Sequence, residues 1–483
     1  MLFNSIDFAI FLPTLFFLYW FVFHKNLRLQ NLLIVLSSYL FYGWWDWRFL
    51  SLLLLSSLID FGAGRALSKT DDAQKRTLLL GISLATNLGL LGFFKYYNFF
   101  VDNFISAFSF FGADIQVNSL HIILPVGISF YTFQTMSYAI DVYRRKLQPT
   151  KDFIEFSAFV SFFPQLVAGP IERATHLLPQ FYTKRVFDHS KAVDGMRQIL
   201  WGLFKKMVIA DNCAVYANLI FNSSEDQSGS TLVMGALFFT FQIYCDFSGY
   251  SDIAIGTSRL FGFDLMRNFS YPYFSRDIAE FWRRWHISLS TWFRDYLYIP
   301  LGGSQGGIWK KIRNTFIIFI VSGFWHGANW TFIAWGALNA LYFLPLLITN
   351  RNRNNLHVVA EGKNFPSLRE LAGMLLTFSL IVFAWIFFRA ENIAHAASYI
   401  SGIFSKSLFT APDFEGIGGA FMTVLLTLGF VTMEWIGRSH SHPLARLGIT
   451  WKRPLRWAMY SFLLFLIGMF MQTEESPFIY FQF

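Results

Sequence analysis

The chain has 483 residues, of which 54% are hydrophobic, 20% are aromatic and only 14% are charged, with a formal net charge of +9. A soluble domain carries about 25% charged residues, and a water-soluble core has no room for the 60 phenylalanines of this chain. The composition therefore excludes a soluble enzyme and predicts an all-α polytopic membrane protein in a lipid bilayer. Because the basic residues stand in clusters between apolar runs, the positive charge indicates cytoplasmic loops and not nucleic acid.

Apolar runs predict about eleven membrane-spanning helices, because a span needs roughly 20 apolar residues. Several runs are short or interrupted, so we also expect re-entrant and interfacial helices. The first run lacks a basic leader and a small-residue cleavage site, and we interpret it as a retained span. Without a repeat or a soluble segment, residues 1–483 are expected to form one membrane-embedded domain. The candidate spans are residues 6–23, 31–46, 48–64, 77–94, 122–142, 196–214, 231–250, 315–348, 369–388, 417–437 and 455–472.

The loops between these runs differ in their content of basic residues. Lys and Arg are frequent in HKNLR, RALSKTDDAQKR, YRRK, RNRNN and GRSHSHPLARLGITWKRPLR, whereas NSSEDQSGS (222–230) and the tail QTEESPFIYFQF (472–483) have none. The positive-inside rule then predicts that the N-terminus, the 222–230 loop and the C-terminus lie outside the cell membrane. An odd number of complete spans satisfies this orientation.

A broken segment follows the fifth candidate span. Residues 153–170, FIEFSAFVSFFPQLVAGP, are too short to cross and contain Pro164 and a Gly-Pro pair. Irregular backbone at membrane depth persists only inside protein or beside water. Gln165 therefore either lines a substrate path or belongs to a re-entrant support, and we favour a support with some contact to the path.

Charged and aromatic residues are interleaved over residues 246–313. Asp246 and Asp252 fall near the inner end of a predicted span, where they line a polar path or, as we favour, cap a helix. Residues 276–301, RDIAEFWRRWHISLSTWFRDYLYIPL, predict one or two amphipathic helices at the cytoplasmic interface. His286 in this segment fits a functional role and an interfacial role equally well. A solvated ion-pair network is expected from Glu280, Arg294 and Asp295, and headgroup anchors from Trp282, Trp285, Trp292, Tyr296 and Tyr298.

A single ionisable ring interrupts the longest uncharged stretch. Residues 314–350 contain no Asp, Glu, Lys or Arg, yet they hold His326 in SGFWHGANW. The first limb, residues 314–325, reaches roughly 18 Å, less than the roughly 30 Å of the bilayer core. If Gly323, Gly327 and Asn329 allow a turn or break, His326 lies below the outer surface, inside the protein.

Two roles are open for His326. An ionisable residue at membrane depth usually marks a functional site, and an imidazole suits general base catalysis near neutral pH. Asn329 and the backbone N–H of Gly327 would then polarise an oxyanion. The alternative is a neutral histidine that donates to a backbone carbonyl between helices.

The C-terminal residues FIYFQF are unusually aromatic for a chain end, which is ordinarily polar and loose. The composition predicts that this end packs into a cavity. Tyr480 would then bring a hydroxyl into the cavity from the outer face, and the alternative is a hydrophobic plug.

Five segments together resemble the membrane-bound O-acyltransferase family, and within it the bacterial branch that acetylates alginate or peptidoglycan or D-alanylates teichoic acid. These segments are LPVGISFYTFQTMSYAIDVYR (124–144), FVSFFPQLVAGPIER (159–173), QIYCDFSGYSDIAIG (242–256), FWRRWHISLSTWFRDYLYIPLGG (281–303) and FWHGANWTFIAWG (324–336). The resemblance implies a ring of helices around a thinned core, with a funnel open to the outside.

The resemblance also implies roles for single residues. His326 corresponds to the near-invariant histidine of the family. His286 occupies a second motif position that is Asn in many eukaryotic relatives. Tyr480 is similar to a tyrosine that carries the acyl group in the D-alanyl system. The predicted substrate path comprises Gln165, Trp325, Trp285 and Asp246.

The function expected from the resemblance is transfer of an acyl group, most simply acetyl from acetyl-CoA, across a bacterial inner or cytoplasmic membrane to an alginate-like polysaccharide. An extracytoplasmic partner resembling a serine hydrolase would complete the transfer, and neither a metal nor a bound cofactor is required. The alternatives are acylation of peptidoglycan or another cell-wall glycan, D-alanylation, and lipid-chain transfer. A transporter would show two related halves with paired broken helices, and a noncatalytic scaffold of a polysaccharide machine would not depend on His326.

Overall fold

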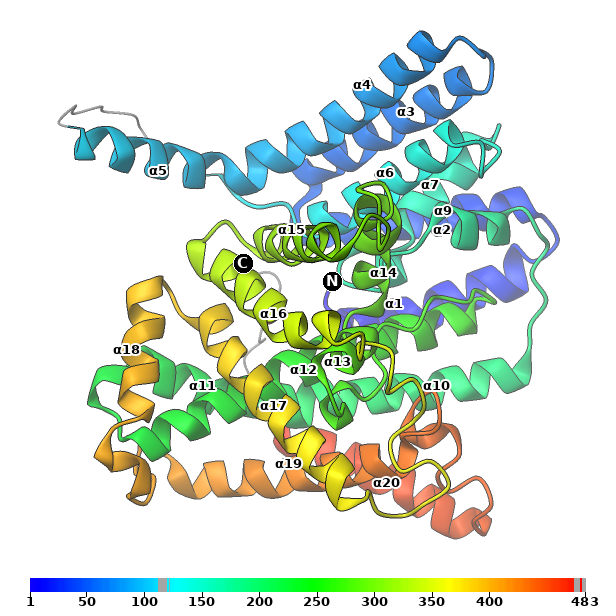
Figure 1. The fold of residues 1–483 in the computed structure, drawn as a ribbon. Coiled ribbons are helices and arrows are strands. Elements are labelled where there is room, and N and C mark those ends of the chain that lie inside the picture. Colours follow the sequence, from blue (N-terminus) through cyan, green and yellow to red (C-terminus); the bar gives the residue numbers. More distant parts are fainter. Residues whose placement is uncertain (112–119, 121, 473–477, 480–483) are drawn as a thin grey trace. The chain divides into compact units, whose positions relative to one another are not determined.

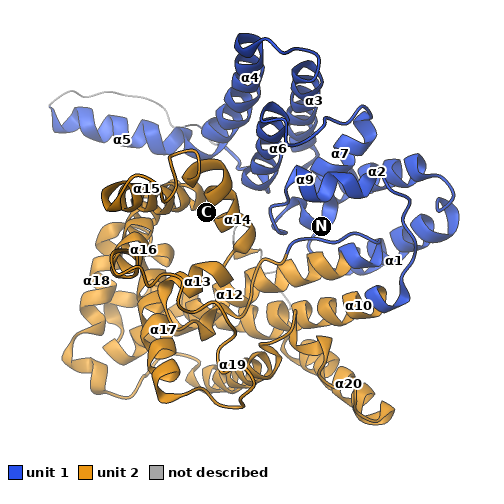
Figure 2. Cartoon of the chain, turned by 45° about the vertical axis from the view of Figure 1, so that its right-hand side comes forward, with its two compact units in different colours: residues 1–191, 258–266 blue, residues 192–257, 267–483 orange. Residues whose placement is uncertain are grey.

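The computed structural model describes residues 1–111, 120, 122–472 and 478–479. Over those residues the regular structure is helical and contains no strand, which confirms the predicted all-α class (Figure 1). The chain divides into two compact units, residues 1–191 with 258–266 and residues 192–257 with 267–483 (Figure 2). The prediction of one membrane-embedded domain is not tested by this division.

Six helical segments of the described chain are long and apolar enough to cross a membrane. They fit the predicted multi-pass membrane protein, whereas the number of about eleven spans stays a prediction. Several candidate spans are short helices, such as α6 with 16 residues, and roughly 20 are needed to cross. The six segments are Leu27–Leu67, Ala73–Phe110, Gly229–Leu260, Trp330–Ile348, Leu368–Arg389 and Ile417–Gly437.

The first unit contains nine α-helices between α1 and α9 in its described residues. Asp72 and Asp152 begin α4 and α7, because each side chain accepts hydrogen bonds from main-chain N–H groups of the first turn. The helices are α1 (Ile6–Phe17), α2 (Leu27–Asp46), α3 (Leu50–Leu67), α4 (Ala73–Leu91), α5 (Tyr97–Phe110), α6 (Ile128–Tyr143), α7 (Phe153–Ser161), α8 (Phe163–Leu166) and α9 (Ala174–Leu177).

The break predicted within residues 153–170 lies between α7 and α8, at Phe162. Both short helices are largely buried. Gln165 Nε2 donates to Oε1 of Gln134 on α6 at 2.6 Å, and Gln134 Nε2 donates to the carbonyl oxygen of Phe159. These contacts hold the segment inside the first unit, and the contact of Gln165 with a substrate path stays a prediction.

A buried carboxylate ties three helices of the first unit together. Asp60 on α3 accepts a hydrogen bond from Ser83 and one of 2.8 Å from Asn87, both on α4. The Asn87 side-chain oxygen in turn accepts from Ser56 at 2.8 Å and from Thr135 of α6 at 3.1 Å. Since all these groups are buried, the cluster fixes the register of α3, α4 and α6.

The second unit contains the longer helices of the C-terminal half. A π-helical turn, η5 (Phe204–Ala210), joins the first two of them into a continuous rod. The helices are α10 (His189–Leu203), α11 (Asp211–Asn222), α12 (Gly229–Leu260), α13 (Ile278–Arg284), α14 (Ile287–Phe293), α15 (Ile308–His326), α16 (Trp330–Ile348), α17 (Leu368–Arg389), α18 (Ile393–Ile403), α19 (Ile417–Gly437) and α20 (Arg453–Phe470).

Glycines let α10 approach α12 at backbone distance. A Cβ on Gly202 would lie 2.6 Å from the carbonyl oxygen of Gly249, and a Cβ on Gly256 would lie 2.5 Å from that of Gly195. No larger side chain fits between the two backbones, because real Cβ atoms do not come within 3.0 Å of another heavy atom. The close approach brings the side chains of η5 against the middle of α12.

The pair α15 and α16 pack side by side (Figure 1), again through glycines. A Cβ on Gly323 would collide with the carbonyl oxygen of Phe332, and a Cβ on Gly336 with that of Phe319. The predicted break separates the two helices after His326, and Asn329 caps α16 by accepting from the N–H of Thr331 at 3.0 Å. The first limb is longer than expected, because α15 already begins at Ile308.

The predicted amphipathic segment forms two short helices, α13 and α14, followed by the π-helical turn η8 (Arg294–Tyr298). Two expectations for it are wrong. Trp285 and Trp292 are buried in protein and do not anchor the chain at headgroup level. Glu280 is also buried, and it pairs with Arg276 and Arg284 away from solvent.

Candidate functional site

His326 is the last residue of α15 and is only 3% exposed. Aromatic rings surround its imidazole: the ring centroids of Trp335 on α16 and Phe388 on α17 both lie 5.3 Å away, in edge-on geometry. Trp325, its neighbour in the chain, lies 5.0 Å away. The end of one helix and the faces of two others thus surround the ring with packed aromatic side chains, and this cluster is called the aromatic chamber below.

A second histidine lies next to it. The ring centroid of His286 is 6.5 Å from that of His326 and 6.1 Å from that of Trp325. His286 stands between α13 and α14 with φ 42° and ψ 55°, the left-handed conformation that few non-glycine residues adopt. The structure therefore brings together the two histidines that the sequence singled out.

Asn268 fixes the orientation and the protonation of His286. The Asn268 Oδ1 atom accepts from the main-chain N–H of Ser288 at 3.4 Å, which identifies it as the oxygen, and it lies 3.0 Å from His286 Nδ1. An amide oxygen can only accept, so Nδ1 carries the proton and Nε2 is the basic nitrogen of the neutral ring. Burial lowers the pKa of His286 to about 3 and keeps the ring neutral.

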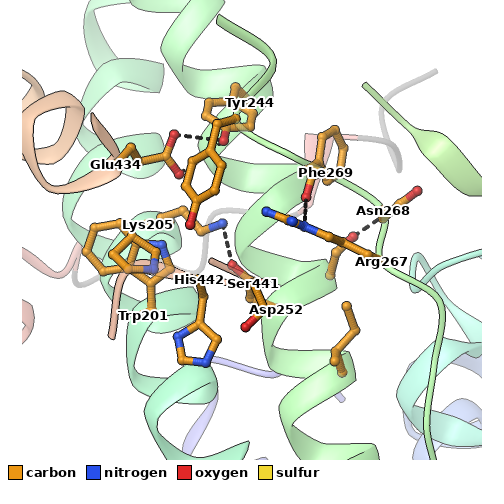
Figure 3. Close-up of a pocket in the computed structure, with 14 residues that line it drawn as sticks. Trp201, Lys205, Tyr244, Asp252, Arg267, Asn268, Phe269, Glu434, Ser441 and His442 are labelled. Atoms are coloured by element: carbon orange, nitrogen blue, oxygen red, sulfur yellow. Dashed lines mark hydrogen bonds and ion pairs between the residues drawn. The ribbon is translucent and has the colours of Figure 1, made fainter. Parts of the chain in front are cut away.

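A narrow cavity reaches the same asparagine (Figure 3). Lys205, Arg267 and His442 contribute basic groups to its lining, and Asn268 and Phe269 form the part nearest His286. Lys205 Nζ lies 2.6 Å from Asp252 Oδ2, and Tyr244 donates to Glu434 at 2.8 Å, as the dashed lines in Figure 3 indicate. The remaining lining residues are Trp201, Ser251, Ile255, Tyr271, Ser441 and Pro443.

Two described residues of the C-terminal tail lie near His286, separated from it by one aromatic ring. Phe478 and Ile479 are buried, as the aromatic composition of the tail predicted. The Phe478 ring lies 5.7 Å from that of Phe247, and the Phe247 ring meets His286 edge-on at 4.7 Å. Tyr480, the predicted acyl carrier, is outside the described residues.

The other predicted site residues have mixed positions. Trp325 is one of the rings around the two histidines. The ring centroid of Trp285 lies 5.0 Å from that of Trp385. Gly327 is required for space, because a Cβ would collide with the ring of Phe332. Asn329 Nδ2 donates to the carbonyl oxygen of Glu391 at 2.7 Å, so this amide has a structural partner and its oxyanion role stays a prediction.

The favoured interpretation of Asp246 and Asp252 as helix caps is wrong, because both lie well inside α12. Asp246 instead pairs with Lys206 at 2.8 Å and accepts from the main-chain N–H of Ile479 at 2.7 Å. Gln165 belongs to the first unit, among the residues of its support.

Sequence reasoning missed Asn268 and Lys206. Asn268 lies 18 residues before its histidine in an irregular segment, and no local pattern links the two. Lys206 stands in a helix that we predicted as an ordinary span. The available signal was its charge within the apolar run 196–214, which ought to have raised the question of its partner.

Comparison with known proteins gives the class. The family model described as MBOAT, membrane-bound O-acyltransferase family, matches residues 146–362. The probable alginate O-acetylase of Pseudomonas putida is 38% identical to this chain over 100% of both sequences. The peptidoglycan O-acetyltransferase of Helicobacter pylori is 36% identical over 83% of this chain and 80% of its own. The teichoic acid D-alanyltransferase of Streptococcus thermophilus is 28% identical over 54% of this chain and 68% of its own.

The helical fold with its candidate spans and these similarities define a multi-pass membrane O-acyltransferase. The chain belongs to the membrane-bound O-acyltransferase family, as the sequence motifs predicted.

Proposed function

We propose that this protein acetylates an extracytoplasmic polysaccharide of the alginate kind, using acetyl-CoA from the cytoplasm and His326 as the general base. The observation that carries the proposal is the juxtaposition of His326 and His286 among aromatic rings. A polar cavity lined by Asn268 and residue Phe478 of the C-terminal tail lie close to His286. The similarity to the alginate O-acetylase, which covers the whole chain, supports acetate and a polyuronate.

The chemistry begins with a hydroxyl beside the thioester carbonyl. His326 accepts the hydroxyl proton as the oxygen attacks the carbonyl carbon, and a tetrahedral oxyanion forms. When the C–S bond breaks, the imidazolium returns a proton to the thiolate, so the products are an ester and free coenzyme A. The low-polarity chamber strengthens any hydrogen bond to the oxyanion.

His286 contributes a fixed basic nitrogen to this chamber. Since Asn268 holds the proton on Nδ1, Nε2 is the atom that can accept a proton or a hydrogen bond from a substrate. We assign His286 the role of orienting the attacking hydroxyl. The alternative, a purely structural role, predicts that an asparagine at this position supports full activity.

We expect the donor to approach beside α12, where Lys205 and Arg267 can attract the phosphates of a coenzyme A thioester. The cavity there measures about 20 Å³ and is also lined by Asp252 and Glu434, so the lining has to open before a thioester enters. The Ser441–Pro443 part of the lining belongs to the most basic loop of the chain, which the positive-inside rule places in the cytoplasm.

Tyr480 supplies the attacking hydroxyl in this scheme. Its acetyl ester is then passed to the serine of an extracytoplasmic hydrolase-like partner, and from there to a hydroxyl of the polysaccharide. This order requires both termini outside the cytoplasmic membrane, the orientation that the basic loops predict.

A peptidoglycan or other cell-wall glycan is the second candidate acceptor. The similarity to the peptidoglycan O-acetyltransferase of Helicobacter pylori favours it, because its 36% identity is close to that of the alginate enzyme. Transfer of D-alanine has weaker support, since the similar D-alanyltransferase matches only 54% of the chain.

The test is incubation of the purified full-length protein in nanodiscs with acetyl-labelled acetyl-CoA, followed by mass analysis of its C-terminal peptide. We expect label on Tyr480 in the wild type and none in His326→Ala or Tyr480→Phe. Tyr298→Phe, which removes a hydroxyl bonded to Ser304 outside the site, serves as the control. Labelling that persists in His326→Ala would remove the proposed mechanism, and polymer acetylation by Tyr480→Phe at the wild-type rate would remove the carrier.

A further inference from the structure

Two successive lysines of η5 make parallel ion pairs with α12. Lys205 Nζ lies 2.6 Å from Asp252 Oδ2, and Lys206 Nζ lies 2.8 Å from Asp246 Oδ1. Lys206 also pairs with Asp211 at 2.8 Å. Both lysines are buried, and both reach α12 because the glycine contacts bring the two backbones together. Both lysines stand in the π-helical turn η5, and a π-turn inside a helix often marks a functional position.

The carboxylates differ in their second partner. Asp252 Oδ1 accepts from the side chain of Gln198 at 2.7 Å, within the same pair of helices. Asp246 Oδ2 accepts instead from the main-chain N–H of Ile479 at 2.7 Å, more than two hundred residues away in the chain. The Lys205–Asp252 pair therefore has its further partner on the same helices, whereas the Lys206–Asp246 pair has its further partner in the C-terminal tail.

The tail is held by its side chain as well as by its backbone. The Phe478 ring lies 5.0 Å from Tyr250 at an interplanar angle of 36° and 5.7 Å from Phe247. Positions 246, 247 and 250 belong to one stretch of α12, so a carboxylate and two rings together contact two consecutive residues of the tail. A carboxylate is a stronger acceptor for an N–H than a neutral group, and Lys206 and Asp211 orient it.

We propose that Asp246, supported by Lys206 and Asp211, is a positioning site that binds the C-terminal tail at Phe478–Ile479 and thereby sets the place from which Tyr480 acts. The binding of the tail follows from the contacts alone. Only its purpose rests on the proposed function, because Tyr480 follows Ile479 directly in the sequence and a fixed Ile479 fixes the start of the carrier segment.

Hydrogen–deuterium exchange of the full-length protein in nanodiscs tests the binding. Asp246→Leu removes the acceptor, and we expect the Ile479 amide to exchange about tenfold faster or more, because hydrogen bonds to charged groups contribute more than neutral ones. Asp246→Asn keeps an acceptor oxygen and is expected to fall between the wild type and Asp246→Leu. Asp252→Asn is the matched control, since it alters the neighbouring lysine pair without touching the tail.

The exchange of α20 peptides reports whether a variant has loosened generally. Wild-type exchange at Ile479 in Asp246→Leu would overturn the proposal, and so would equal acceleration by Asp252→Asn. If Asp246→Leu does not fold, Asp246→Asn alone decides: protection equal to that of the wild type, together with unchanged labelling of Tyr480, would overturn it.

A kinetic readout separates this inference from the proposed function. Asp246→Asn is expected to lower the rate of acetyl transfer to Tyr480 with little change in the KM for acetyl-CoA, because it shifts the acceptor and not the donor. His326→Ala is expected to abolish transfer while the tail amide stays protected. If His326→Ala retains transfer, the proposed function fails and the exchange result for Asp246 still stands.

Discussion

Two regions of this protein bury ionisable side chains between helices and differ in the surroundings of those side chains. In the first unit, Asp60 is enclosed by Ser83, Asn87 and, through Asn87, Thr135, all neutral hydrogen-bonding groups of adjacent helices. In the second unit, His286 and His326 lie at helix ends, 6.5 Å apart and walled by aromatic rings.

The difference shows what a buried ionisable group indicates. The carboxylate of Asp60 completes its hydrogen bonds within its own helices, which is a means of fixing helix register. His286 instead has a left-handed backbone near a cavity and near Phe478, and His326 is the last residue of its helix. Burial alone therefore does not distinguish a structural group from a proposed catalytic one, and the environment of each group has to be compared.

The largest expected effect is on catalysis at His326. His326→Gln should lower acetyl transfer by about 10²–10⁴-fold, the usual contribution of a general base, while the melting temperature changes by only a few degrees. Transfer to polymer and thermal unfolding of the purified protein measure the two quantities. A variant that keeps more than a third of wild-type activity would contradict the catalytic assignment.

The converse is expected for Asp60. Asp60→Ala should destabilise the protein by about 2–4 kcal/mol, because the buried Ser83 and Asn87 donors lose their acceptor, yet the activity per folded molecule should remain. Thermal unfolding and specific activity of the folded fraction measure this. Asp71→Ala, at an exposed pair with Arg145, is the control and should leave the melting temperature unchanged. Loss of specific activity in folded Asp60→Ala would show that the two regions are not separable.

A smaller catalytic loss is expected at His286. His286→Asn should lower transfer by about tenfold to a hundredfold through loss of the basic nitrogen. Asparagine tolerates the left-handed backbone, so stability should be nearly unchanged. His286→Val adds backbone strain to the same chemical loss and should unfold at a lower temperature. Full activity of His286→Asn would assign this ring to packing only.

The pH dependence of stability provides a further contrast. The pKa of His286 is about 6.5 in the unfolded chain, whereas burial lowers its pKa in the folded protein to about 3. Between these two pKa values only the unfolded chain binds the proton. The contribution of the neutral His286 ring to the free energy of unfolding is therefore complete above about pH 6.5 and is lost as the pH falls. Between roughly pH 7 and pH 5, the range in which an unperturbed histidine titrates, the melting temperature should therefore drop more steeply for the wild type than for His286→Asn. Parallel curves for the two proteins would contradict the burial of a neutral ring.

The smallest effect concerns Asn329. Asn329→Ser keeps an N-cap for α16 and should cost less than about 1 kcal/mol, with transfer within about threefold of the wild type. A loss of about 10²–10³-fold, the effect of removing an oxyanion donor, would instead support the oxyanion role predicted from the sequence. Kinetics at saturating acetyl-CoA distinguish these outcomes.

The sequence alone determined the membrane class, the break after His326, the short helical structure around His286 and the burial of Phe478 and Ile479 in the tail. These features depend on local composition, on the spacing of apolar residues and on turn-forming residues, which act over one or two helical turns. The family motifs added the pairing of His326 with His286 as a functional expectation.

Only the tertiary structure decided which polar groups meet. The partnerships of Asn268 with His286, of Asp246 with Lys206 and the tail, and of Asp60 with Asn87 all join separate elements. They depend on how closely helices approach, and close approach is set by glycines such as Gly202 and Gly249 facing each other across a contact. A periodicity along one helix carries no information about the helix that will lie against it, and for this reason the predicted caps at Asp246 and Asp252 were wrong.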